Sequence, residues 1–166
     1  MNIVLLDSGT LPVPLTAPAW AGGWSARLAT RAADVVHALE DAAIAITNKV
    51  PIRAADLKRL PKLRFICIAA TGFDCIDIDA CRESGVIVSN VPGYSAQSVS
   101  EWALASIFAL RRNLFAYRET ARIGWAASPN FCVHDAPILD IAGSTLGIIG
   151  RGAIGSSLAR LARAVG

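Results

Sequence analysis

Hydrophobic residues in the first half of the chain gather in short apolar runs separated by segments with helical spacing. Runs this apolar are typical of parallel strands that are covered on both faces. Alternation of such strands with helices predicts an α/β domain with a mostly parallel sheet. The runs lie at residues 2–6, 25–30, 43–47, 63–69 and 85–90.

Helical spacing between these runs predicts helices over residues 32–42, 52–60 and 77–85. The last of them ends on Gly85, a residue that commonly caps the carboxyl end of a helix. Residues 7–24 are rich in Pro, Gly and Trp, so this segment is expected to be irregular.

The pattern changes after Asn90, where a loop with Pro and Gly begins. Residues 98–125 contain no Pro, and no Gly before Gly124, which predicts one continuous helix. Apolar residues surround its first three turns, so this part is expected to be buried. Residues 126–144 are predicted to form a loop, and they are followed by a strand at 145–149 and a helix from 153 onward.

Composition and charge narrow the class of protein. The chain has 166 residues, of which 54% are hydrophobic and 17% charged, which argues against disorder. The net charge of +3 comes from scattered residues, and no basic run is longer than a pair such as Arg111-Arg112. Nucleic-acid binding is therefore not expected.

Four cysteines show no CxxC motif and no metal-ligand spacing with the two histidines, so we expect no metal site and a reducing compartment. Cys67 stands in an apolar run and is interpreted as a small buried hydrophobic residue. Asp7 interrupts the first apolar run before a signal peptide could form. The apolar stretch 102–110 is too short to span a membrane. A cytoplasmic protein is predicted.

The sequence Gly150-Arg151-Gly152-Ala153-Ile154-Gly155 is a GxGxxG motif between an apolar run and an amphipathic helix. The first glycine permits a tight turn, the second lets a pyrophosphate approach the backbone, and the third lets helix and strand pack closely. Free N–H groups at the helix start then hold the phosphates. A dinucleotide site is favoured, and a strand–helix turn without a ligand is the alternative.

Three stretches, "ITNKVPI" (46–52), "AATGFDCIDIDACRESGVIVSNVPGYSAQSVSE" (69–101) and "FCVHDAPILDIAGSTLGIIGRGAIGSSLARLARAVG" (131–166), carry a resemblance to a known family. In order and spacing they resemble the N-terminal half of the D-isomer-specific 2-hydroxyacid dehydrogenases, closest to the glycerate and hydroxypyruvate-type members. The resemblance implies reversible hydride transfer between NAD or NADP and a small 2-keto or 2-hydroxy acid.

The same resemblance implies two α/β domains. Residues 1–97 would form a flavodoxin-like substrate-binding domain, and 98–142 would form the interdomain helix and a loop. Residues 143–166 would form only the first strand and helix of a Rossmann coenzyme domain. An acidic residue that reads the adenosine ribose is expected about 20 positions after the motif. Since no such residue follows within the chain, the choice between NAD and NADP stays open.

By resemblance, the backbone amides of Thr71, Gly72 and Phe73 hold the substrate carboxylate, and Lys49 lines the same site. Val99 matches a position on the nicotinamide side. The alternatives are a sharp strand-to-helix turn at 71–73, a solvated lysine, and a core valine. Ala153 and Ile154 are expected to offer N–H groups to the pyrophosphate. The cofactor-binding residues implied by the resemblance are Val99, Gly150, Arg151, Gly152, Ala153, Ile154 and Gly155.

The family's catalytic Arg, Glu and His lie downstream of the glycine motif, so none is expected within these residues. His37 stands near acidic neighbours on a predicted helix and is interpreted as solvated, and His134 is not expected to be catalytic. The family usually has Ala-Glu where this chain has Ser100-Glu101, a change that we expect to be harmless. The 166-residue chain alone is therefore expected to be a truncated, inactive piece with weak or no NAD(P) binding.

An apolar strand at 145–149 without neighbours would expose unpaired edges, so a homodimer or swapped oligomer is expected. The alternative function is a non-catalytic binding or assembly module derived from the same family. A flavodoxin-type electron carrier is a third hypothesis, and the absence of a phosphate loop after the first strand argues against it. The sequence leaves the particular 2-hydroxy acid open.

Overall fold

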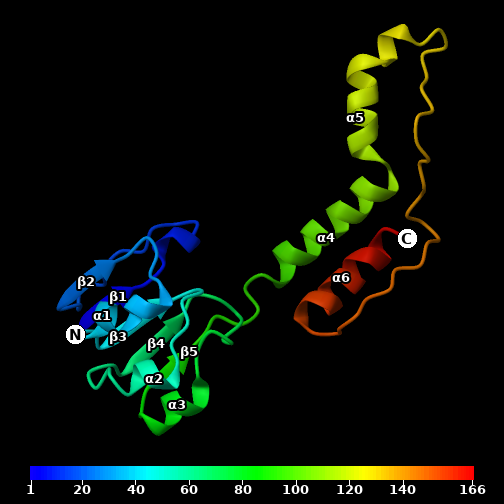
Figure 1. Ribbon diagram of the computed structural model, residues 1–166. Helices are drawn as coiled ribbons and strands as arrows, with labels where there is room; N and C mark the ends of the chain where they lie inside the picture. Colours follow the sequence, from blue (N-terminus) through cyan, green and yellow to red (C-terminus); the bar gives the residue numbers. More distant parts are fainter. The chain divides into compact units, whose positions relative to one another are not determined.

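Five parallel strands form the sheet of the computed structural model, which describes residues 1–166. The sheet lies in an N-terminal unit, Met1–Pro92, and the strand order is β2-β1-β3-β4-β5 (Figure 1). Every strand pair is parallel, which confirms the predicted fold class. The strands are β1 (Asn2–Leu5), β2 (Gly23–Ala26), β3 (Ile44–Thr47), β4 (Phe65–Ile68) and β5 (Ile87–Ser89).

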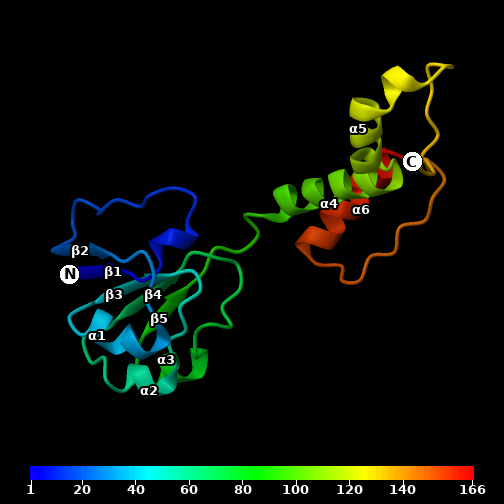
Figure 2. The same cartoon turned by 45° about the horizontal axis from the view of Figure 1, so that its top comes forward.

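Helices cover one face of this sheet. A 3-10 turn, η2 (Ala32–Asp34), leads into α1 (Val35–Leu39), and α2 (Ala54–Leu57) and α3 (Ile78–Glu83) follow. All three α-helices lie on the same side, and the irregular segment with η1 (Ser8–Thr10) lies on the other (Figure 2).

The strands were expected to be covered on both faces, and in β1 the consecutive residues Ile3, Val4 and Leu5 are all buried, although α-helices cover only one face. From β2 through β3 and β4 to β5, each connection steps in the same direction across the sheet. Right-handed crossovers then place every helix on one face. Only the connection from β1 to β2 steps the other way, and it contains no α-helix.

The core lies between the sheet and these helices. Along β3 and β4 the side chains alternate between buried and half-buried positions, as expected for strands with one helix-covered face. Cys67 is on the half-buried side, so its predicted burial is wrong, and Cys81 of α3 is the buried cysteine. Gly85 has a φ of +67° just after α3, which confirms the predicted helix end.

The C-terminal unit, Gly93–Gly166, is helical. It contains α4 (Ala96–Arg111), α5 (Leu114–Ile123), η3 (Trp125–Ala127) and α6 (Ala153–Ala164). No helix of the chain is both long enough and apolar enough to cross a membrane.

The prediction of one continuous helix over 98–125 is wrong, because the helix breaks at Asn113. This residue has a φ of +49°, in the left-handed region, and the chain changes direction there (Figure 1). Asparagine enters that region more readily than most residues. Its side-chain amide also donates to the carbonyl of Pro137, which fixes the bend.

The α4 helix packs beside α6, and the two lie alongside each other in both views (Figures 1 and 2). The expected burial of α4 is wrong: Trp102 is 73% exposed, and Ser100 is the fully buried residue of this helix. The predicted strand at 145–149 is not formed either. Without a neighbouring strand to pair with, its backbone stays unpaired and Ile149 is fully exposed.

Candidate functional site

The loop after β4, residues 69–74, offers three consecutive backbone donors. The N–H groups of Thr71, Gly72 and Phe73 make no hydrogen bond within the chain, and all three residues are exposed. Successive free N–H groups form a concavity that suits an anion such as a carboxylate. We call this segment the β4 loop.

Contacts from the segment after β5 hold the β4 loop in place. The Asn90 Nδ2 group donates to the carbonyl of Thr71 at 2.8 Å, and the Thr71 hydroxyl donates to the carbonyl of Val91 at 3.0 Å. Val91 N–H in turn donates to Ala70 at 3.0 Å. These bonds occupy the carbonyl and hydroxyl groups of the loop and leave its N–H groups free.

Lys49 lies at the same edge of the sheet as the β4 loop. It follows β3, which is the parallel neighbour of β4, with Thr47 opposite Ile68 in the register. The Thr47 carbonyl accepts a hydrogen bond from Ala69 N–H at 2.8 Å, which joins the two strand ends. The Lys49 side chain is exposed and can reach an anion at this edge.

One thiol, that of Cys75, directly follows the β4 loop. Burial raises the pKa of the Cys75 thiol, and the adjacent Asp74 carboxylate raises it further. The Arg53 guanidinium donates to the carbonyl of Asp74 at 3.0 Å and so fixes the far end of the loop.

The glycine turn, Gly150–Gly155, has the backbone shape that its three glycines permit. Gly150 has a φ of +98°, which a residue with a side chain rarely adopts. A β-carbon on Gly155 would overlap the carbonyl oxygen of Gly150, so only glycine allows this close approach. A β-carbon on Gly152 would meet no atom within 4 Å, which leaves open space on that side.

The amino end of α6 is uncapped. Gly152 is its N-cap residue and provides no side-chain acceptor, so the first N–H groups of the helix have no partner in the chain. They include those of Ala153 and Ile154. Together with the helix dipole, such groups form a ready anion site. A cavity of about 420 Å³ lies against this turn, lined by Gly150, Arg151 and Gly155 among others.

Val99 belongs to the same C-terminal unit as the glycine turn. It is 40% exposed on α4, directly before the buried Ser100. The Ser100 hydroxyl lies 2.9 Å from the hydroxyl of Ser157 on α6. The predicted site residues thus fall into two groups, the β3 and β4 strand ends in one unit and α4 with the glycine turn in the other.

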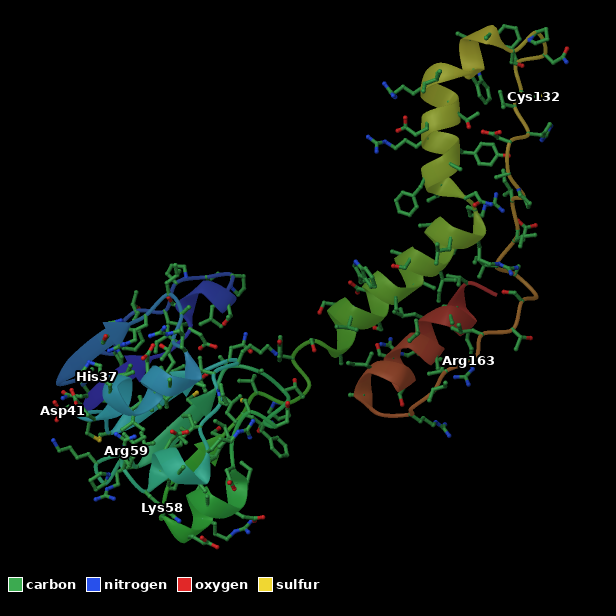
Figure 3. The ribbon with its side chains drawn as sticks, viewed as in Figure 1. His37, Asp41, Lys58, Arg59, Cys132 and Arg163 are labelled. Atoms are coloured by element: carbon green, nitrogen blue, oxygen red, sulfur yellow. The ribbon has the colours of Figure 1, made fainter.

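The two histidines lie in different units, His37 in the N-terminal one and His134 in the C-terminal one. His37 lies near Asp41 at the end of α1 (Figure 3), and its side chain is 76% exposed, which confirms the solvated interpretation. The backbone carbonyl of Asp41 accepts a hydrogen bond from the side chain of Asn2, at the start of β1. Asp41 therefore lies at the edge of the sheet opposite to the β4 loop. His134 is exposed on a loop, and its neighbour Asp135 bonds Thr120 instead.

Two residues that were not predicted from the sequence as site residues support this site. Asn90 holds the β4 loop, and the Asp7 carboxylate accepts hydrogen bonds from Asn48 N–H and Lys49 N–H. A signal for both existed in principle. Each follows a parallel strand at its carboxyl end, where ligand sites of open α/β sheets lie.

Comparison with known proteins decides the family. A family model described as D-isomer specific 2-hydroxyacid dehydrogenase, catalytic domain, matches residues 25–153. The chain belongs to the D-isomer-specific 2-hydroxyacid dehydrogenase family.

Relatives within this family include enzymes of glycerate metabolism. The chain is 48% identical to a glycerate dehydrogenase of Methylorubrum extorquens, over 80% of this chain and 43% of that protein. It is 31% identical to a hydroxypyruvate reductase of Blautia hydrogenotrophica, over 80% of this chain and 42% of that protein. The matched region thus covers less than half the length of these two relatives.

Solved structures show the same fold. An acyclic imino acid reductase (Bsp5), in complex with NADPH and D-Arg, matches with a TM-score of 0.77 and 27% identity, over 99% of this chain and 53% of that one. An NAD+-bound 3-phosphoglycerate dehydrogenase of Entamoeba histolytica matches with a TM-score of 0.71 and 22% identity, which supports the fold alone. Dinucleotide-bound structures are therefore found among the neighbours of this family member.

Proposed function

We propose that this chain supplies the acid-binding loop and the pyrophosphate-binding turn of an NAD(P)-dependent dehydrogenase for a small 2-hydroxy acid of the glycerate or hydroxypyruvate class. The proposal rests on two groups of backbone N–H donors that have no acceptor within the chain. One group lies on the β4 loop and the other at the start of α6. The reaction requires two anion sites, one for the carboxylate of the acid and one for the phosphates of the cofactor.

The β4 loop fits a carboxylate. Thr71, Gly72 and Phe73 would donate their N–H groups to its oxygens, and the Lys49 ammonium would add a positive charge at the same edge. A carboxylate that accepts several N–H bonds is held in one orientation. The keto or hydroxyl carbon of the acid would then be fixed relative to the loop, which hydride transfer requires.

The glycine turn fits a dinucleotide. Gly152 leaves open space where a pyrophosphate would lie, and the uncapped N–H groups of Ala153 and Ile154 would donate to its oxygens. Arg151 adds a positive charge on the turn, and Val99 would contact the nicotinamide side. When bound, the nicotinamide would accept or supply the hydride.

These 166 residues alone are proposed to bind the acid, to bind the cofactor weakly or not at all, and to catalyse no turnover. A general acid near the β4 loop is needed to protonate the carbonyl as the hydride arrives. Within the N-terminal unit His37 is not held there, because it lies near Asp41 at the opposite edge of the sheet. The non-catalytic alternative differs in one respect, since it predicts that the acid site serves binding only.

Exposed apolar side chains favour association of two copies. Trp102, Leu110 and Phe115 line a groove of about 470 Å³ in the C-terminal unit. A contiguous apolar surface of this kind commonly marks an interface. We propose a homodimer or swapped oligomer, and sedimentation at several concentrations tests it. A monomer at every concentration would contradict the proposal.

Amide chemical shifts of the isotope-labelled chain test the two anion sites separately. Titration with D-glycerate is expected to shift the amides of Thr71, Gly72 and Phe73. Titration with pyrophosphate is expected to shift those of Ala153 and Ile154. D-Glycerate shifts that are absent or confined to other segments would refute the acid site.

A matched pair of glycine variants tests whether the pyrophosphate binds at the glycine turn. A β-carbon at Gly152 or at Gly147 would meet no neighbouring atom, so both positions accept alanine without a clash. Only Gly152→Ala places a methyl group where the pyrophosphate would lie. Pyrophosphate shifts should therefore weaken in Gly152→Ala and persist in Gly147→Ala, and equal behaviour of the two variants would refute the assignment of the turn.

A further inference from the structure

Asp7 is a buried carboxylate without an ion-pair partner. Its residue is 3% exposed, and none of the ion pairs of the structure includes it. Its Oδ2 atom accepts from Lys49 N–H at 2.7 Å, and Asn48 N–H lies 3.0 Å from Oδ1 and 3.1 Å from Oδ2. A buried charge costs free energy unless hydrogen bonds compensate it. Here the compensation comes from two backbone N–H groups, 41 and 42 positions away.

The location of Asp7 in the sheet is unusual. It follows β1, and β1 lies between β2 and β3, where the strand order reverses. In open parallel sheets the crevice at this reversal, beyond the carboxyl ends of the strands, is the common ligand site. Asn48 and Lys49 present consecutive N–H groups there, and the Asp7 carboxylate already occupies them. The chain fills this anion site with its own side chain, which leaves the neighbouring β4 loop as the open one.

The turn that Asp7 holds, residues 47–50, is also fixed from behind. The Thr47 hydroxyl is buried and accepts a hydrogen bond from Val50 N–H at 3.0 Å. Val50 is itself buried. The backbone at Lys49 is thus held on both sides, and its side chain is exposed.

We infer that Asp7 is a positioning residue for acid binding. By fixing the N–H groups of Asn48 and Lys49, it sets the direction in which the Lys49 ammonium leaves the turn, toward the edge shared with the β4 loop. This inference rests on the proposed function, because it requires Lys49 to contribute to binding of the acid. Asp7 touches no substrate in this account and acts through the backbone of Lys49.

Affinity for D-glycerate, measured by amide-shift titration of the full 166-residue chain, tests the inference. Asp7→Asn keeps the shape of the side chain but replaces one acceptor by a donor that faces an N–H group. We expect about a tenfold loss of affinity, since a charge-assisted contact is removed. The matched control is Asp79→Asn, which removes one exposed carboxylate of α3 and should leave the affinity unchanged.

A double-mutant cycle with Lys49→Ala separates positioning from a general effect on folding. If Asp7 acts through Lys49, Asp7→Asn should cause no further loss in the Lys49→Ala background. A full additional loss in that background would overturn the inference, and so would an Asp7→Asn variant with unchanged affinity.

Hydrogen exchange of the unmodified chain provides a test that needs no variant to fold. The amides of Asn48 and Lys49 should be protected, and exchange at the rate of an unstructured peptide would overturn the inference. Absence of D-glycerate binding by the unmodified chain would instead refute the proposed function on which the inference rests. The two failures are therefore distinguishable.

Discussion

The Ser100 hydroxyl lies 2.9 Å from the Ser157 hydroxyl and joins α4 to α6 through one hydrogen bond. Ser100 is fully buried, and its hydroxyl also donates to the carbonyl of Gln97 at 2.9 Å. Ser100 therefore adds a polar contact between the two packed helices. Ser100 directly follows Val99 on α4, and Ser157 lies on α6, the helix that begins at the glycine turn.

Removal of either hydroxyl should weaken the packing of α4 on α6. We predict that Ser157→Ala lowers the free energy of unfolding by about 1 kcal/mol, the net value of one hydrogen bond, and that Ser100→Ala lowers it somewhat more because it also removes the bond to Gln97. The double variant should lose about as much as Ser100→Ala alone, because the bond between the two hydroxyls is removed in both cases. Urea unfolding measures all three. Fully additive losses would show that the two hydroxyls do not act together.

Substitution at the third glycine of the motif should damage the fold more than substitution at the second. Gly155→Ala forces a β-carbon into the carbonyl oxygen of Gly150, whereas Gly152→Ala meets open space. We expect Gly155→Ala to destabilise the C-terminal unit by about 2 kcal/mol, a typical cost of overpacking, with little change for Gly152→Ala. Thermal unfolding of the two variants compares them. Equal melting temperatures would contradict the observed close approach.

Asn90 should matter for acid binding although it offers no group to the acid. Asn90→Ala removes the donor to the Thr71 carbonyl, so the β4 loop loses one of its anchors. We predict about 1 kcal/mol lower stability of the N-terminal unit and weaker D-glycerate binding. Asn130→Ala is the control, since Asn130 lies on a loop of the other unit. Unchanged D-glycerate affinity in Asn90→Ala would contradict the role of this anchor.

Thiol labelling should follow burial. Burial raises the pKa of the Cys67, Cys75 and Cys81 thiols, so at a given pH a smaller fraction of each is the reactive thiolate. Cys132 is exposed on the loop after η3 (Figure 3) and should react first with an alkylating reagent at neutral pH. Raising the pH should accelerate labelling of the other three, and Cys81 should stay slowest. Mass spectrometry at successive times gives the order of labelling. Labelling of Cys81 before Cys132 would contradict this prediction.

The local features of the fold could be predicted from the sequence because local rules decide them. Apolar runs mark β3 and β4, and Gly85 marks the end of α3 through its positive φ. The break at Asn113 was missed because asparagine carries only a weak preference for the left-handed region. The strand at 145–149 has the right composition, but a strand also needs a partner, which local composition does not reveal.

The candidate site was only partly predictable, because some of its contacts join segments that are far apart in the sequence. The β4 loop and the glycine turn are continuous motifs, and the sequence displays them directly. Asp7 and Lys49 are brought together by the order of β1 and β3 in the sheet. No spacing along the chain signals that contact. The contribution of Ser157 likewise depends on the packing of α4 against α6.

We propose that these residues supply the acid site and the cofactor turn of a D-2-hydroxyacid dehydrogenase. The most direct test joins them to the remaining half of the Methylorubrum extorquens glycerate dehydrogenase and measures NADH oxidation with hydroxypyruvate. We expect turnover by this chimera, strong loss of turnover when Lys49→Ala is introduced, and no turnover by the 166-residue chain alone. A folded, NADH-binding chimera that reduces no 2-keto acid would contradict it, as would turnover by the chain alone.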